Sequence, residues 1–252
     1  MTSRERINRA ISFQEPDRVP IDIAGSKMTG VHVDEYIEIC SALGFEGELP
    51  KVYEQLQMIV RPDGDMRRAL YSDVIELEND SERWGLINKN WKVWVTQKGN
   101  RVLMPGNFDP SVENDGSIYI LDSSGNKIAY MNPGGLYFDP IYPPSTGGSP
   151  FQIDPDKYKK SIYLYSEEEL KNLEERALFL HNFTDYAVIG GFLKGTLRNN
   201  NMAGMSVDDW LITLVSEPEY ASEILQAVTE RALENLKLYI EAVGANIDII
   251  LV

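Results

Sequence analysis

Residues 18–25, with the sequence RVPIDIAG, predict a short buried strand that ends in a glycine turn. Three later stretches have the same apolar character: DVIEL at 73–77, YAVIGGF at 186–192 and IDIILV at 247–252. A segment with apolar residues at helical spacing precedes each of these three stretches. Apolar strands that alternate with helices are typical of a parallel sheet whose faces are covered by helices.

Five segments predict helices, at 3–13 with Ser3 as N-cap, about 32–43, 166–179, 206–216 and 218–243. Ser166 precedes Glu169 by three residues, which is the spacing of a capping box. Residues 50–70 are expected to be irregular and then helical. Residues 139–160, rich in Pro and Gly, are expected to form a surface loop.

Residues 84–140 have a different pattern, rich in Trp, Tyr and Gly, in which polar and apolar residues alternate. The alternation predicts two β-hairpins, one turning at 98–100 and the other at 124–126. We interpret this segment as a β insertion within the α/β fold.

The four predicted strands are half the number that closes a (β/α) barrel. The sequence also stops inside an apolar strand, which would leave a strand edge uncovered. We therefore expect an α/β fold of the (β/α)8 TIM-barrel type, of which residues 1–252 cover about the first half as one domain. The alternative is a smaller open α/β sheet that is complete as given.

The composition restricts the classes of partner. The formal charge of −15 and the pI near 4.6 disfavour nucleic acid and anionic membrane surfaces as partners. The one cysteine, Cys40, cannot form an internal disulfide, which fits a reducing compartment. No stretch has the apolar run of a signal peptide or a membrane span. These observations predict a cytoplasmic protein.

Several motifs occur in a characteristic order. The chain opens with RERI at 4–7 and QEPDRVPID at 14–22, and later contains NPGGLYFD at 132–139, VIGGF at 188–192 and AVGANID at 242–248. The opening resembles the start of uroporphyrinogen decarboxylase-like proteins, in which a helix carrying RER precedes a PDRVP turn into the first barrel strand. The third motif is similar to the PGGYYFD segment of methyltransferase-type members, and the last two resemble later strands of the family.

This superfamily contains two chemistries. Its decarboxylases remove carboxyl groups from the acetate arms of uroporphyrinogen without a cofactor, and bind substrate carboxylates through the arginines of an RQAGR motif at the end of the first strand. Its methyltransferases move a methyl group between a small donor or thiol acceptor and a corrinoid protein, using zinc. Here Asp22 and Ser26 stand where the arginines would be, and Lys27 is a partial replacement.

Two further decarboxylase signatures follow the second and third strands. Asp80 falls at the register of a pocket aspartate and is the predicted catalytic carboxylate, although it also reads as a loop residue among Glu76, Glu78 and Glu82. An Asn stands near the position of the family's tyrosine after the third strand. Because two of three signatures are missing, the resemblance implies a methyltransferase.

The predicted substrate-binding residues lie at strand ends, where barrels carry their chemistry. They are Asp22, Gly25 and Ser26 after the first strand, and Phe192, Lys194, Arg198, Asn199 and Asn200 after the third. The alternatives are that Asp22 caps a turn, that Gly25 only supplies backbone freedom, and that the later loop only caps a helix.

The cofactors follow from the resemblance. Neither His32 nor His181 has a cysteine at zinc-ligand spacing. The resemblance implies zinc ligands beyond Val252, where a His-x-Cys pair and a later Cys would bind zinc. It also implies a corrinoid of the cobalamin type on a partner protein, and it suggests a homodimer. A cofactor-free decarboxylase and a non-catalytic ligand-binding barrel remain alternatives.

Aromatic side chains gather in and beside the β insertion. They either wall a ligand pocket or form a small core beneath the insertion: Trp84, Trp91, Trp94, Tyr137 and Phe138.

Overall fold

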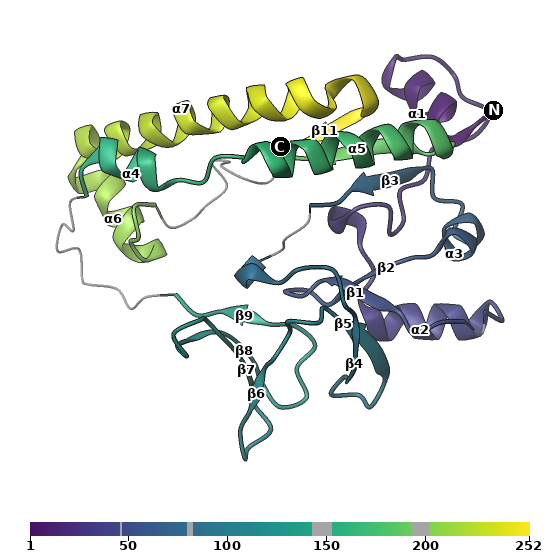
Figure 1. The fold of residues 1–252 in the computed structure, drawn as a ribbon, viewed down its shortest axis with the longest axis horizontal. Helices are drawn as coiled ribbons and strands as arrows, with labels where there is room; N and C mark the ends of the chain where they lie inside the picture. Colours follow the sequence, from purple (N-terminus) through teal and green to yellow (C-terminus); the bar gives the residue numbers. More distant parts are fainter. Residues whose placement is uncertain (46, 80–82, 143–152, 193–201) are drawn as a thin grey trace. The chain divides into compact units, whose positions relative to one another are not determined.

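The computed structural model describes residues 1–45, 47–79, 83–142, 153–192 and 202–252 (Figure 1). The chain divides into two compact units. Unit 1 comprises Met1–Ile141 and Thr184–Ile189, and unit 2 comprises Tyr142–Phe183 and Gly190–Val252. In the part of the chain that is described, no helix has the length and apolar character that crossing a membrane requires.

Unit 1 contains α1 (Ser3–Ile11), the short 3-10 helices η1 (Lys27–Thr29) and η2 (Arg83–Gly85), α2 (Val33–Ala42) and α3 (Gly64–Ala69). The first two α-helices confirm the predictions at 3–13 and 32–43. The N-cap of α1 is Thr2, one residue before the predicted cap. Its side chain forms a capping box with Glu5.

Two small sheets of unit 1 surround one hydrophobic core. The first has the order β2-β1-β5-β4 and contains β1 (Lys51–Glu54), β2 (Ile59–Arg61), β4 (Lys92–Val95) and β5 (Arg101–Met104). The second runs β6-β7-β8-β9 and contains β6 (Ser111–Val112), β7 (Ile118–Leu121), β8 (Lys127–Met131) and β9 (Asp139–Pro140). Val52, Met104, Phe108, Ile120 and Met131 from both sheets and their connections are buried in this shared core.

Both predicted hairpins are confirmed, as antiparallel β4–β5 and β7–β8. The sequence does not predict β1 and β2, because strands this short show little alternation. They pair with each other in antiparallel orientation, and β1 then pairs with β5 in parallel. The hairpin segment therefore shares a sheet with residues that precede β3.

The third sheet is parallel, with the order β11-β10-β3. In unit 1, β3 (Val74–Leu77) lies beside the start of β10 (Ala187–Gly191), and in unit 2 the end of β10 lies beside β11 (Ile249–Leu251). These strands confirm three of the four predicted. The fourth, at 18–25, is not a strand, although the Ile21 carbonyl accepts a hydrogen bond from Asp73 N–H at 2.7 Å.

Unit 2 is mainly helical, with α4 (Pro155–Ser161), α5 (Glu167–Phe183), α6 (Val207–Ser216), α7 (Pro218–Val243) and the 3-10 helix η3 (Gly244–Asn246). The long helices α5 and α7 pack against each other (Figure 1). The predicted helices and the capping box of Ser166 and Glu169 are confirmed. Helix α4 lies where a loop is predicted, and Asp154 caps its first turn.

The predicted (β/α)8 TIM-type barrel is wrong. The described residues form a mixed α/β structure with three separate small sheets, and no closed barrel is found among them. The physical reason is where the apolar residues go. Those of the predicted insertion pack with β1 and β2 into a core of their own, and residues 18–25 form no strand ladder.

Asp73, directly before β3, is fully buried and anchors the start of the chain. Its carboxylate accepts hydrogen bonds at 2.6–2.9 Å from the side chains of Ser3, Arg6 and Arg18 and from the N–H of Ile21. Arg6 also binds Asp17, and this hydrogen bond lowers the pKa of Asp17 to about 2. The residues of the opening motif therefore hold residues 18–21 against the start of β3.

Candidate functional site

The segment that follows this anchor lies against β3 at Gly25. A Cβ added to Gly25 would lie 2.3 Å from Val74 Cγ2 and 3.0 Å from the Val74 carbonyl oxygen. Non-bonded contacts of a Cβ atom below 3.0 Å essentially never occur, so the chain passes β3 at this point only because residue 25 lacks a side chain. Gly25 therefore sets how closely Asp22 and Ser26 approach β3.

We expect Gly25→Ala to lower the free energy of unfolding by about 1–3 kcal/mol, because the new methyl group overpacks this contact. Urea unfolding followed by tryptophan fluorescence measures the change. Gly47→Ala is the matched control, because a Cβ at Gly47 meets no atom of the described residues within 4 Å. Equal stability of the two variants would contradict the close approach.

Asp22 and Ser26 meet in one turn. Thr29 Oγ1 donates a hydrogen bond to Asp22 Oδ1 at 2.7 Å and lies 3.3 Å from Ser26 Oγ. The Ser26 side chain is buried, and Ala24 N–H donates to the Thr29 carbonyl at 2.9 Å. The structure thus brings together the three predicted residues after the first segment, and Asp22 braces the turn that carries Lys27.

A buried polar group lies beside this turn. Glu76, in the middle of β3, accepts hydrogen bonds at Oε2 from Lys27 N–H (2.9 Å) and from the Tyr53 hydroxyl (3.1 Å). Lys27 Nζ lies 3.9 Å from Glu76 Oε1 and 5.7 Å from the centroid of the Tyr53 ring. The side chain of Glu76 is only 3% exposed, so this ammonium–carboxylate pair is shielded from solvent.

The two oxygens of Glu76 differ. Oε2 has two donors, whereas Oε1 accepts no hydrogen bond from the described residues although it is buried. Burial raises the pKa of Glu76, and the charge of Lys27 and the hydrogen bonds to Oε2 only partly oppose this effect. Oε1 is therefore the atom that is suited to carry a proton or to bind a polar ligand.

Two arginines near this group already have partners. Arg61 forms an ion pair with Glu78 and lies 6.0 Å from the centroid of the Tyr53 ring. Arg67 donates to the Val74 carbonyl at 3.0 Å, and burial lowers its pKa. Neither guanidinium is placed as a free clamp for substrate carboxylates.

The sequence interpretation underestimates Glu76, which it treats as one of several acidic neighbours of Asp80. The signal that identifies it is a charged residue inside an otherwise apolar strand, because such a residue is buried only with partners. Lys27 is predicted as a partial replacement for arginine, and it does face a carboxylate. Tyr53 is not predicted, because it lies on the unpredicted strand β1.

Of the other predicted site residues, the structure describes only Phe192. Phe192 lies in unit 2, where it is buried, its ring centroid is 5.7 Å from that of Tyr239 and its N–H donates to the Leu251 carbonyl. These are the contacts of a core residue. The remaining predictions fall outside the described residues: Asp80, Lys194, Arg198, Asn199 and Asn200.

Some aromatic side chains of the β insertion form a small core, and others line a pocket. Phe138 is buried and makes edge contacts with Trp84 and Phe108, so this part is a core. Tyr137 is half exposed and lines a pocket. Trp91 lies 5.8 Å from the guanidinium of Arg61.

The residues present do not fit a zinc ion. Over the ranges that the structure describes, no three His, Cys, Asp or Glu side chains are grouped as metal ligands. Cys40 is partly buried in α2, and burial raises the pKa of its thiol, which disfavours the thiolate that binds metals. The zinc ligands that the resemblance implies lie beyond Val252, and zinc there remains a prediction.

Comparisons with protein-family models, with curated proteins and with solved structures give no match for this chain.

Proposed function

We propose that this chain holds the small substrate of an enzyme that moves a methyl group between a small donor or thiol acceptor and a corrinoid protein. The observation that carries the proposal is the buried group of Lys27, Tyr53 and Glu76, next to the turn braced by Asp22. Together with Asp22, this group offers one ammonium and two carboxylates, which suits a small substrate better than a polycarboxylate. The resemblance of residues 132–139 to methyltransferase-type members supports the same conclusion.

Glu76 would act as the proton donor in this reaction. When the bond between the methyl carbon and the donor heteroatom breaks, the heteroatom keeps the electron pair and needs a proton. Glu76, with its raised pKa, gives that proton from Oε1. Lys27 N–H and Tyr53 hold Oε2, which fixes the orientation of the carboxyl group.

The corrinoid protein is the co-substrate that accepts or supplies the methyl group. A zinc ion, where ligands outside the described residues bind it, would supply Lewis-acid activation of the donor or thiol. Because the described residues do not fit zinc, no step above depends on it. We place the reaction in the cytoplasm, because a single cysteine suits a reducing compartment.

A cofactor-free decarboxylase of a small carboxylate is the second candidate, and the pair of Lys27 and Glu76 favours it. The Lys27 ammonium would bind the substrate carboxylate before it leaves as CO2. The carbon atom keeps the electron pair of the broken bond, and protonated Glu76 would supply its proton.

One experiment separates these functions. The natural gene product is incubated with reduced free cobalamin, in place of the corrinoid protein, and with methoxy, methylamine or methylthiol donors. We expect absorbance spectra to show methylated cobalamin with at least one donor. Release of CO2 from small carboxylic acids without cobalamin would select the decarboxylase, and ligand binding with neither reaction would overturn both.

A further inference from the structure

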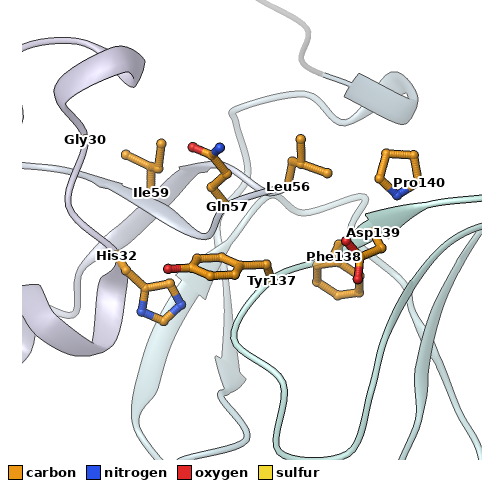
Figure 2. Close-up of a pocket in the computed structure, with 9 residues that line it drawn as sticks. All are labelled: Gly30, His32, Leu56, Gln57, Ile59, Tyr137, Phe138, Asp139 and Pro140. Atoms are coloured by element: carbon orange, nitrogen blue, oxygen red, sulfur yellow. The ribbon is translucent and has the colours of Figure 1, made fainter. Parts of the chain in front are cut away.

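A second site in unit 1 is a pocket of about 480 Å³ beside the segment that joins β8 to β9. Figure 2 shows the Tyr137 ring between His32 on one side and Phe138 and Asp139 on the other, with Gln57 across from it. All of its lining residues belong to unit 1. A volume of this size accommodates a small molecule.

The walls of this pocket combine apolar, aromatic and polar groups, and Asp139 is the one carboxylate among the described lining residues. Leu56, Ile59 and Phe138 supply apolar surface, and no Lys or Arg is found among the described lining residues. Asp139 is exposed, and its carboxylate forms no hydrogen bond or ion pair within the described ranges. An anionic ligand would meet this carboxylate without any compensating cation, so the pocket disfavours anions.

The Tyr137 ring is held in position. Its centroid lies 5.4 Å from that of His32 at an interplanar angle of 86°. His32 is itself fixed, because Nε2 donates to the Leu136 carbonyl at 3.0 Å and Nδ1 lies 2.7 Å from Glu35 Oε2. Nδ1 also accepts a hydrogen bond from Asp34 N–H at 3.2 Å, so both ring nitrogens of His32 have partners.

We propose that this pocket binds a small organic cation, of the methylated ammonium class. An aromatic ring, a carboxylate and neighbouring apolar side chains are the groups that recognise a cation with an apolar shell. The net charge of −15 further concentrates small cations near the protein. The inference rests on the pocket alone and does not require methyl transfer at Glu76.

The test compares choline with 3,3-dimethylbutan-1-ol, which has the same shape without the charge. Titration calorimetry on the natural gene product measures both, and then measures choline with Tyr137→Leu and Asp139→Asn. We expect choline to bind and the alcohol not to bind, and each substitution to weaken choline binding about tenfold.

The controls match residue type and exposure outside the pocket. They are Tyr71→Leu, at an exposed tyrosine, and Asp109→Asn, at a carboxylate whose side chain is 97% exposed. Circular dichroism checks that the variants fold. If Tyr137→Leu does not fold, the comparison of Asp139→Asn with Asp109→Asn alone tests the proposal. Equal binding of the alcohol, absence of choline binding, or equal loss in variants and controls would each overturn the proposal.

Discussion

We expect Asp73→Asn to lower the free energy of unfolding by about 3–5 kcal/mol. The fully buried carboxylate of Asp73 is the common acceptor for two arginines, Arg6 and Arg18. An amide removes the negative charge and presents N–H groups to these donors. The guanidinium of Arg6, whose side chain is 9% exposed, then keeps Asp17 as its one charged partner among the described residues.

Tryptophan fluorescence during urea unfolding measures this loss, because Trp84, Trp91 and Trp94 all lie in unit 1 and only Trp210 lies in unit 2. Asp109→Asn is the control, since its side chain is 97% exposed. We expect that control to change stability by less than about 0.5 kcal/mol. A loss below about 1 kcal/mol for Asp73→Asn would contradict the role of the buried ion pairs.

The ion pairs of Asp73 also determine how the free energy of unfolding depends on pH. Burial alone would raise the pKa of Asp73, but hydrogen bonds from Ile21, Arg18, Ser3 and Arg6 outweigh it and lower the pKa. The stabilisation is therefore present above the pKa of an unfolded aspartate and is lost as the pH falls through the folded value. Urea unfolding curves should show that the free energy of unfolding of the wild type decreases from neutral to acidic pH. The decrease should be smaller in Asp73→Asn.

We expect Glu76→Gln to slow methyl transfer by about 10²–10⁴-fold in kcat. The amide keeps an oxygen that accepts from Lys27 N–H and Tyr53, but it carries no proton to give. Because the shape of the group is nearly unchanged, KM for the donor should change far less than kcat. Initial rates with reduced cobalamin and the active donor measure both constants.

The pH profile distinguishes a proton donor from a merely structural glutamate. Burial raises the pKa of Glu76, so the protonated form, and with it the wild-type rate, decreases as the pH rises through that value. Glu76→Gln should lack this decrease, and Glu76→Asp should partly restore the rate. Glu174→Gln, at an exposed position of α5, is the control. An unchanged rate in Glu76→Gln would refute the assignment.

The sequence predicts the helices well because their signals are local. Periodic apolar residues and the Ser166–Glu169 capping box locate α5, α6 and α7 within a few residues. The hairpins are equally local, since Gly99 and Gly125 both occupy turns with positive φ. The fold class depends instead on which strands pair over long distances, and no local pattern encodes that β1 pairs with β5.

The candidate site is only partly predictable for the same reason. Asp22, Gly25 and Ser26 are close in sequence, and a strand-end argument is enough to bring them together. Glu76 and Tyr53 are brought to Lys27 only by the tertiary fold. Glu76 and Lys27, for example, are 49 residues apart in the sequence. The opening motif shows the opposite case, because its arginines and Asp17 serve an internal anchor and not a ligand.

The anchoring of α1 has a consequence for the order of events during synthesis. Arg4 N–H donates to the Asp185 carbonyl at 2.7 Å, and the Arg4 side chain reaches the carbonyls of Thr184 and Tyr186, 180 and 182 residues away. A ribosome makes the chain from its N-terminus, so the first helix emerges long before these partners exist. Helix α1 must therefore remain undocked, or be bound by a chaperone, until residues 184–186 have been translated.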